Sequence, residues 1–470
     1  MSSVSALNSL LSSSSSSSAI DISSILQAAT GASSSGIDVT AAVNSALTAA
    51  REPETNWENQ EYALQSQVTA LDTLQTDASN LDNDAQSLNS LVGPLSARTV
   101  SSSNSNIVSA SAASGSAPGN HDVVVNNLAT TASWTSGTFA SASTAMPAGS
   151  FTITTGSGGS ATVTTDGTQT LSQVASQITS DNVGVTARVV TDATGSRLAI
   201  VANSSGTAAN FTVTTGLSGF GFTQAATGNN ASLTVDGIQI SSATNTVTGA
   251  VPGLTLNLLG AAPGVNVSLG VAPDTSQAAS AINQFVSDYN TLITDLTTQF
   301  TFSGTSEGPL ATDSIVRSLQ SEVLGTLSYT YSPTSGSTTV PNLTSLGISV
   351  GNDGKLTVDS GALQNTLQSN FSDVQNFFQG TALNGFANSV DQQLTSFISP
   401  SDGAFTVDLQ SINSGITDLQ NNISNFETNY ITPLKTKLTS EYSQAEILLQ
   451  QLPMEMQQIN TELGLNNTKS

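Results

Sequence analysis

Residues 64–95 read LQSQVTALDTLQTDASNLDNDAQSLNSLVGPL and contain two interleaved apolar series. The first series repeats every seven residues, at Leu64, Leu71, Ala78, Ala85 and Val92. The second follows three residues after the later members of the first, at Leu74, Leu81, Leu88 and Leu95. This heptad pattern predicts a coiled-coil-like helix. Gly93-Pro94 should end the helix, because a proline ring clashes with the carbonyl four residues back.

A second long helix is predicted between Ile412 and Leu463, where apolar residues keep a spacing of three or four. Successive steps of four from Tyr430 to Tyr442 locally relax the supercoil that a strict heptad would impose. Pro433 and Pro453 should kink or cap this helix without erasing the pattern. The two helices together give the predicted structural packing residues: Leu64, Leu71, Leu74, Leu81, Leu88, Ile416, Leu419, Ile423, Phe426, Leu438, Leu449 and Leu452.

Between the helices, the region from Arg98 to about Val271 is dominated by short alternating runs that predict β-strands. Asp166-Gly167 and Asp236-Gly237 are expected to form hairpin turns, because this residue pair favours the tight turns that join antiparallel strands. One helix is expected around residues 171–178. The region should therefore form two β subdomains.

Helix returns at Asp274, a good N-cap, and continues with apolar residues at helical spacing to about Phe300. Further helices are expected over residues 315–327, 363–378 and 386–397. A small strand pair, residues 346–350 and 355–358, should be joined through Asp353-Gly354.

The predicted fold is therefore α+β and multidomain: both chain ends form one long coiled-coil-like helical leg, and two mainly-β head domains are inserted between them. We expect the following domains: a disordered Ser-rich export or terminal segment (1–36); the N-terminal leg helix (37–97); an inner β head domain (98–139 and 223–273); an outer β head domain (140–222); a helical leg segment with a small β hairpin (274–404); and the C-terminal helix and tail (405–470).

The charge balance excludes several classes of partner. The chain has 470 residues, of which only 9% are charged, and its 33 Asp and Glu against 9 Lys and Arg give a formal net charge of −24. Nucleic acids and anionic membrane surfaces should repel such a chain. The absence of cysteine excludes disulfides and thiolate sites. No apolar run approaches the ~20 residues that a membrane-spanning helix needs, so we expect no membrane insertion. We expect no Sec signal, because the first basic residue is Arg51.

The same residues give little support to catalysis. His121, the only histidine, begins an alternating strand and has no second histidine or cysteine with which to hold a metal. The Asp-Gly pairs lack the remaining ligands of a calcium loop. Acidic residues are plentiful, but nothing singles out a carboxylate pair for glycoside hydrolysis. We therefore expect no catalytic residue, no cofactor and no metal site.

The apolar helix faces fit two interpretations. They can form a bundle core within one chain, and they can also leave an apolar stripe that packs against neighbouring chains.

Several segments, taken in order along the chain, resemble sequence blocks of the flagellar filament cap family. GIDV (36–39) and AREP (50–53) resemble its entry to the first helix, and residues 149–201 are similar to the flagellin hook IN repeat. The remaining matching segments are residues 233–258, 274–292 (with FVSDYN), 309–319 (PLATDSIVRSL) and 346–363 (LGISVGNDGKLTVDSGAL). The chain departs from the family in its long Ser-rich leader and in a C-terminal helix with few basic residues.

The resemblance implies a structural cap at the tip of the flagellar filament, which guides flagellin into place and prevents loss of monomers. It implies an extracellular protein, exported through the flagellar type III channel. The implied partners are further copies of the chain in a ring, flagellin, hook–filament junction proteins and a cytoplasmic export chaperone on the C-terminal helix. Host mucin or other glycans are a further candidate. The alternatives are a hook–filament junction protein or flagellin-like subunit, a secreted adhesin that binds host glycans through the β heads, and an enzyme inserted in the head.

Overall fold

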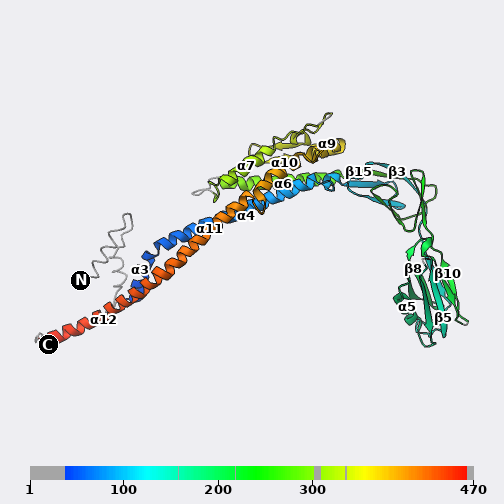
Figure 1. Cartoon of the computed structure of the whole chain (residues 1–470), viewed down its shortest axis with the longest axis horizontal. Helices are drawn as coiled ribbons and strands as arrows, with labels where there is room; N and C mark the ends of the chain where they lie inside the picture. The colour runs from blue at the N-terminus through cyan, green and yellow to red at the C-terminus, as the bar shows by residue number, and fades with distance from the viewer. Residues whose placement is uncertain (1–37, 157, 218, 301–307, 334–335, 463–470) are drawn as a thin grey trace. The chain divides into compact units, whose positions relative to one another are not determined.

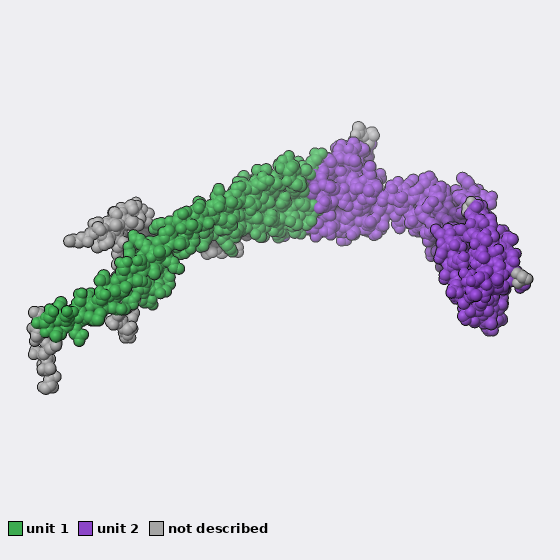
Figure 2. Space-filling view, turned by 60° about the horizontal axis from the view of Figure 1, so that its bottom comes forward, with its two compact units in different colours: residues 1–80, 291–324, 392–470 green, residues 81–290, 325–391 purple. Residues whose placement is uncertain are grey.

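The computed structural model describes residues 38–156, 158–217, 219–300, 308–333 and 336–462 (Figure 1). The Ser-rich segment 1–36 lies outside this range, so the expectation that it is disordered stays a prediction. The chain divides into two compact units (Figure 2). The first contains residues 1–80, 291–324 and 392–470, and the second contains residues 81–290 and 325–391.

The predicted heptad helix is present as α4, Glu52–Asn89, preceded by a shorter helix α3, Val39–Ala50. The Asp38 side chain caps α3 by accepting from the Ala41 amide at 2.9 Å. Helix α4 ends before Gly93-Pro94, and Val92 beyond it is 77% exposed, whereas Leu95 is buried in the short turn Pro94–Ser96. The pattern in the sequence therefore extends past the helix, as expected from the proline.

A buried glutamine covers the end of α4. The last carbonyls of a helix have no partner within it. Gln379, which is 4% exposed, donates from Nε2 to the carbonyl oxygens of Leu88 at 3.2 Å and Ser90 at 3.0 Å. A residue almost 300 positions away in the sequence thus fixes where this helix stops.

The inner β domain consists of two antiparallel sheets around one apolar core. Its five-stranded sheet has the order β1-β15-β3-β11-β12, and its three-stranded sheet has the order β13-β14-β2. Alternate residues point into the core, as in Leu254–Leu258, where every second side chain is buried. The strands are β1 Arg98–Ser102, β2 Val108–Ala112, β3 Gly119–Asn127, β11 Ala231–Val235, β12 Ile238–Ser242, β13 Thr246–Thr248, β14 Leu254–Leu258 and β15 Val267–Pro273.

The outer β domain has a four-stranded sheet of order β10-β4-β8-β7, a three-stranded sheet of order β6-β5-β9 and the helix α5, which shares their core. Helix α5 begins with a reciprocal capping box between Thr170 and Gln173. Its elements are β4 Thr131–Ser136, β5 Gly149–Thr155, β6 Ser160–Thr165, α5 Leu171–Ser180, β7 Val185–Asp192, β8 Gly195–Ser205, β9 Phe211–Thr215 and β10 Phe222–Ala226.

The outer domain is larger than the sequence suggested. Strands β4 and β10 pair with each other and β4 pairs with β8, although the predicted boundaries of 140 and 222 assign β4 and most of β10 to the inner domain. The two crossings of the chain meet where the Thr130 amide donates to the Asn229 carbonyl at 2.9 Å. Alternating strands look alike in sequence whichever sheet they join, so only the pairing places this boundary at about residues 130 and 228.

The two Asp-Gly pairs behave differently. Asp236-Gly237 joins β11 to β12 as a two-residue hairpin, with Val235 opposite Ile238 and positive φ at both turn residues, so this prediction is confirmed. Asp166-Gly167 is not a hairpin: it links β6 to α5, and the Asp166 carboxylate accepts from the Thr168 amide at 2.8 Å. This local hydrogen bond forms a turn without any second strand.

After β15 the chain is helical, with one small hairpin. Asp274 caps α6, as predicted, by accepting from the Gln277 amide at 3.0 Å. The predicted helix 363–378 is divided at Asn370 into two helices. The elements are α6 Thr275–Phe300, α7 Ser314–Thr326, β16 Ile348–Val350, β17 Leu356–Val358, α8 Ser360–Ser369, α9 Phe371–Gln379 and α10 Phe386–Ile398.

The C-terminal helix is continuous in outline but changes its winding. It consists of α11, Ala404–Phe426, a π-helical turn, Glu427–Ile431, and α12, Thr432–Glu462. The wide turn lies directly before Pro433, where a regular α-helix would lose a hydrogen bond and clash with the ring. Helical ends with β domains inserted between them confirm the predicted α+β class. None of the helices in the described part of the chain is long and apolar enough to cross a membrane.

These contacts predict where the outer β domain can be removed. Deleting residues 131–227 and joining Thr130 to Gly228 should leave a soluble protein with intact helices, because the two ends already meet. Deleting only 140–222 should cause aggregation, since it leaves β4 without β8 and removes Phe211, whose carbonyl accepts from Trp134 Nε1 at 2.9 Å. Size-exclusion chromatography and circular dichroism compare the two variants. Equal solubility of both would contradict the assignment of β4 to the outer domain.

Candidate assembly site

The predicted packing residues of the N-terminal helix lie in its interior face. Leu71, Leu74, Leu81 and Leu88 are at most 1% exposed, and Leu64 is half-buried. The alanines between them, Ala78 and Ala85, are fully buried. Short side chains at these positions let neighbouring segments approach the helix closely. The structure therefore brings the members of the two apolar series from Leu71 to Leu88 together on one covered face of α4.

The predicted packing residues of the C-terminal helix are less covered. Ile416, Leu419, Ile423, Phe426 and Leu438 are half-buried. Leu449 and Leu452 remain 44% and 49% exposed in the single chain. Their assignment as packing residues therefore stays a prediction, and it requires a partner that the described residues do not supply.

Helices α3 and α12 pack side by side through a small apolar cluster (Figure 1). Val43, Leu47 and Ile431 are its buried centre. Half-buried side chains surround them, including Phe426, which meets Trp57 edge-on at 5.5 Å and stacks on Tyr430 at 5.0 Å between ring centroids. Aromatic pairs in these geometries add to the stabilisation from burial alone. The π-helical turn contributes Ile431 and Tyr430, so the change in winding positions this contact.

An arginine joins the two helices beside this cluster. Arg51 lies between α3 and α4 and contacts the carboxylates of Glu54 and, at 2.7 Å, Glu427. The hydrogen bond to Glu427 is the main cause that raises the pKa of Arg51. Glu54 is 6% exposed, and a buried carboxylate needs a paired charge. Sequence reasoning missed this role, because 376 positions separate Arg51 from Glu427.

Beyond Tyr442, α12 carries an unusual number of exposed apolar side chains, which we call the α12 apolar segment. Each of them is between 44% and 63% exposed in the described chain. Single exposed apolar residues are ordinary on protein surfaces, but a contiguous set is typical of an interaction site. The segment comprises Ile447, Leu448, Leu449, Leu452, Met454, Met456 and Ile459.

The only histidine makes a contact that holds two parts of the inner β domain together. His121 Nδ1 lies 2.8 Å from Asp236 Oδ2, and Asp236 Oδ1 accepts from the Asp122 amide at 2.9 Å. The hydrogen bond from His121 is the largest cause that lowers the pKa of Asp236. These contacts tie strand β3 to the β11–β12 turn. The described residues contain no group of three or more side chains suited to hold a metal ion.

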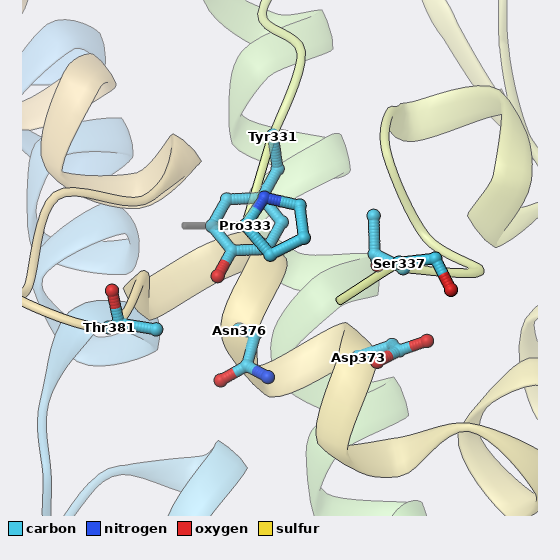
Figure 3. A pocket seen from close by; sticks show the side chains of 7 residues that line it. Tyr331, Pro333, Ser337, Asp373, Asn376 and Thr381 are labelled. Carbon is cyan, nitrogen blue, oxygen red and sulfur yellow. The ribbon is translucent and has the colours of Figure 1, made fainter. Parts of the chain in front are cut away.

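A small pocket of about 280 Å³ lies beside α9 (Figure 3). Asp373 is its charged side chain, and it already accepts from the amide and hydroxyl of Thr339 at 2.7 and 2.6 Å. These bonds lower the pKa of Asp373 and leave the carboxylate as an acceptor rather than a proton donor. Tyr331, Ser337 and Asn376 also line the pocket.

The Arg51 bridge makes a prediction about stability. Arg51→Ala should lower the free energy of unfolding of the α3–α12 region by about 1–3 kcal/mol, because Glu54 loses the charge that compensates its burial. Lys437→Ala should change it by at most about 0.5 kcal/mol, since the pair between Lys437 and Glu441 is exposed and 3.8 Å long. Thermal unfolding followed at 222 nm measures both variants. Equal effects would show that Arg51 does not support Glu54.

Comparison with known proteins identifies the family. The family models described as flagellar hook-associated protein 2 N-terminus and C-terminus match residues 35–132 and 228–454, and together they cover more than half of the chain. The two matched segments lie on either side of the outer β domain. They contain the N-terminal long helix, most of the C-terminal helix and the inner β domain.

Individual relatives agree with this match. The B-type flagellar hook-associated protein 2 of Pseudomonas aeruginosa is 26% identical over 409 residues, which are 78% of this chain and 83% of that protein. The flagellar hook-associated protein 2 of Aeromonas caviae is 26% identical over 361 residues, or 72% of this chain and 76% of the relative.

A solved structure shares the fold. The D1-D2-D3 domains of the flagellar cap protein FliD from Escherichia coli match with a TM-score of 0.59 and 24% identity, covering 73% of this chain and 99% of theirs. These relatives do not favour a hook–filament junction protein, a flagellin-like subunit or an adhesin. The chain therefore belongs to the flagellar hook-associated protein 2 family of flagellar cap proteins.

Proposed function

We propose that this chain assembles into a ring at the tip of the flagellar filament, guides incoming flagellin into place and prevents loss of monomers. The observation that carries the proposal is the match of both helical ends and the inner β domain, in order, to one family. The work is mechanical: it consists of folding assistance and retention and makes no covalent bond. Hook–filament junction proteins are further proposed partners.

The α12 apolar segment supports assembly with neighbouring subunits. Burial of a leucine side chain contributes about 1.5–3 kcal/mol relative to an exposed one. Leu449 and Leu452 leave about half of their surface uncovered, so a neighbouring helix would gain much of this stabilisation. The low number of charged residues along the chain adds little electrostatic cost to such packing.

The same segment fits the proposed export chaperone. Exposed apolar side chains on a helix end promote aggregation in the cytoplasm unless another protein covers them. We propose that a chaperone covers the α12 apolar segment before the chain leaves the cell through the flagellar type III channel. A neighbouring subunit then replaces the chaperone in the assembled flagellum.

Binding of host mucin or other glycans by the β heads stays a prediction. Sugar rings stack on exposed aromatic side chains, and the described head residues have no aromatic side chain that is exposed. Trp134 packs against Phe211 with ring centroids 6.5 Å apart. This arrangement favours a packing role for the aromatic residues of the outer β domain.

Two leucine variants separate assembly from folding. Leu452→Asp should keep the helical circular dichroism of the wild type but fail to assemble, because Leu452 is 49% exposed in the single chain and a neighbouring subunit would have to cover it. Leu81→Asp should lose helical structure, since Leu81 is 1% exposed and a buried unpaired carboxylate is costly. Gln451→Asp adds the same charge on the exposed neighbouring position of α12 and should assemble normally. Loss of helicity in Leu452→Asp would contradict the proposal.

The cellular role is tested by deleting the gene. The deletion strain should release unpolymerised flagellin into the medium and swim poorly, and the wild-type chain should restore filaments. Immunolabelled filaments should carry the protein at their tips in electron micrographs. Label along the shaft or at the base, or filaments of normal length in the deletion strain, would overturn the cap role.

A further inference from the structure

Carboxyl groups in the helical part of this chain meet one another across helices. The chain has 33 acidic and 9 basic residues, so most carboxylates have no cation available. Among the described aspartates with a raised pKa, three are in contact with a second carboxyl group. These contacts join Asp82 of α4 to Asp391 of α10, Asp84 of α4 to Asp288 of α6, and Asp408 of α11 to Asp313 before α7.

The most buried pair is Asp82 with Asp391. Asp82 is 6% exposed, and its Oδ1 is buried without a hydrogen-bond partner. Its Oδ2 accepts from Gln86 Nε2 at 2.8 Å, and the same Nε2 donates to Asp391 Oδ1 at 2.9 Å. One amide group therefore draws both carboxyl groups together and leaves one buried oxygen of Asp82 unsatisfied.

The other two pairs repeat this asymmetry. Asp84 Oδ2 and Asp408 Oδ2 are also buried without a partner. The carboxyl groups that face them accept hydrogen bonds. Both Asp288 oxygens accept from Gln284 Nε2 at 3.0 and 3.1 Å, and Asp313 Oδ1 accepts from the Ile315 amide at 2.7 Å. In each pair, one carboxyl group has a buried oxygen that lacks a donor, and its partner accepts at least one hydrogen bond.

We propose that each pair holds one proton, carried by the undersupplied carboxyl group and donated to its partner, so that the helices tighten as the medium changes from slightly alkaline to mildly acidic. A proton satisfies the buried oxygen and removes one of two negative charges in contact. A metal ion fits less well, because each site offers two carboxyl groups, and no cluster of three metal-ligating side chains is found in the described chain. The inference is independent of the cap function.

The directions of the pKa shifts agree with this proposal. Burial, then Asp391, raises the pKa of Asp82 to about 7, while Gln86 opposes this shift. Burial, then the facing carboxyl, raises the pKa of Asp84 and of Asp408 to about 6. The charged group that acts on Asp82 from α10 is Asp391, and the one that acts on Asp84 from α6 is Asp288. No Lys, Arg or His of the described residues acts on Asp82.

The sign of the pH dependence follows from these shifts. The folded pKa values lie above the unfolded value of 3.8, so the folded chain binds more protons between about pH 4 and pH 7. The stabilisation is complete below this window and is lost as the pH rises through about 6–7. Hydrogen bonds lower the pKa of Asp274 and Asp373, whose contributions are lost only below about pH 4.

Carbon-13 NMR of the full chain, labelled at the aspartate carboxyl carbons, tests the proposal directly. One carboxyl resonance should titrate near pH 7, and it should be absent in Asp82→Asn and altered in Asp391→Asn. Asp72→Asn removes an equal charge from an exposed position of α4 and should leave this resonance unchanged. Titration of every aspartate below about pH 5 would overturn the proposal.

Thermal unfolding followed at 222 nm gives a second readout. The wild type should unfold at a higher temperature at about pH 5 than at about pH 8. Asp82→Asn should raise the midpoint at the higher pH and reduce the difference, because the amide N–H replaces the shared proton, whereas Asp72→Asn should follow the wild type. Millimolar Ca²⁺ or Mg²⁺ should not raise the midpoint at the higher pH. A rise that Asp82→Asn abolishes would mean that the pair binds a cation instead, against the proposal.

Discussion

The apolar face of α4 has to be covered along most of its length, and the order of the whole chain follows from this constraint. Its leucines at 71, 74, 81 and 88 are essentially inaccessible, and each contributes about 1.5–3 kcal/mol when buried. Contacts to α4 come from distant segments, as with Gln379 at its end and Asp391 beside Gln86. The helix is therefore covered only after the β domains have been synthesised and the chain has returned. Such long-range contacts predict slow folding.

Scarcity of positive charge shapes the remaining contacts. The chain has only 9 basic residues, and several of them are engaged in contacts within the fold. Arg51 joins two helices, and Arg98 donates to the backbone carbonyls of Ser116 and Ala97. Carboxylates without a cation are satisfied by amides and hydroxyls, as Asp373 is by Thr339. Where two carboxyl groups meet in the interior, neither a cation nor a neutral donor satisfies all of their oxygens, as Asp82 Oδ1 shows.

Local patterns in the sequence predicted the local features of the structure. The heptad series located the buried face of α4, and Asp236-Gly237 located a two-residue hairpin. Both depend on residues that are neighbours in the chain. The same logic was wrong for Asp166-Gly167, because a turn residue pair does not determine whether a strand or a helix comes after the turn. The sequence predicted a kink or a cap at Pro433, and the structure has a π-helical turn, Glu427–Ile431, just before it.

The contacts that join distant segments left no local trace. Arg51 and Glu427 are 376 positions apart, and Gln86 and Asp391 are 305 apart, so no spacing rule could pair them. The membership of strands in the two β domains depended on pairing in the same way. The exposure of Leu449 and Leu452 also required the structure, since an amphipathic pattern predicts a packing face without saying whether this chain or another covers it.

The meeting of the two chain crossings at Thr130 and Asn229 has an evolutionary consequence. A module that leaves and re-enters its host at adjacent residues can be lengthened, shortened or exchanged while the host keeps its own register. Selection acting on the outer β domain is thereby separated from selection acting on the helices. The same junction is a natural splice site for grafting a foreign domain, for example to display an antigen on the flagellum.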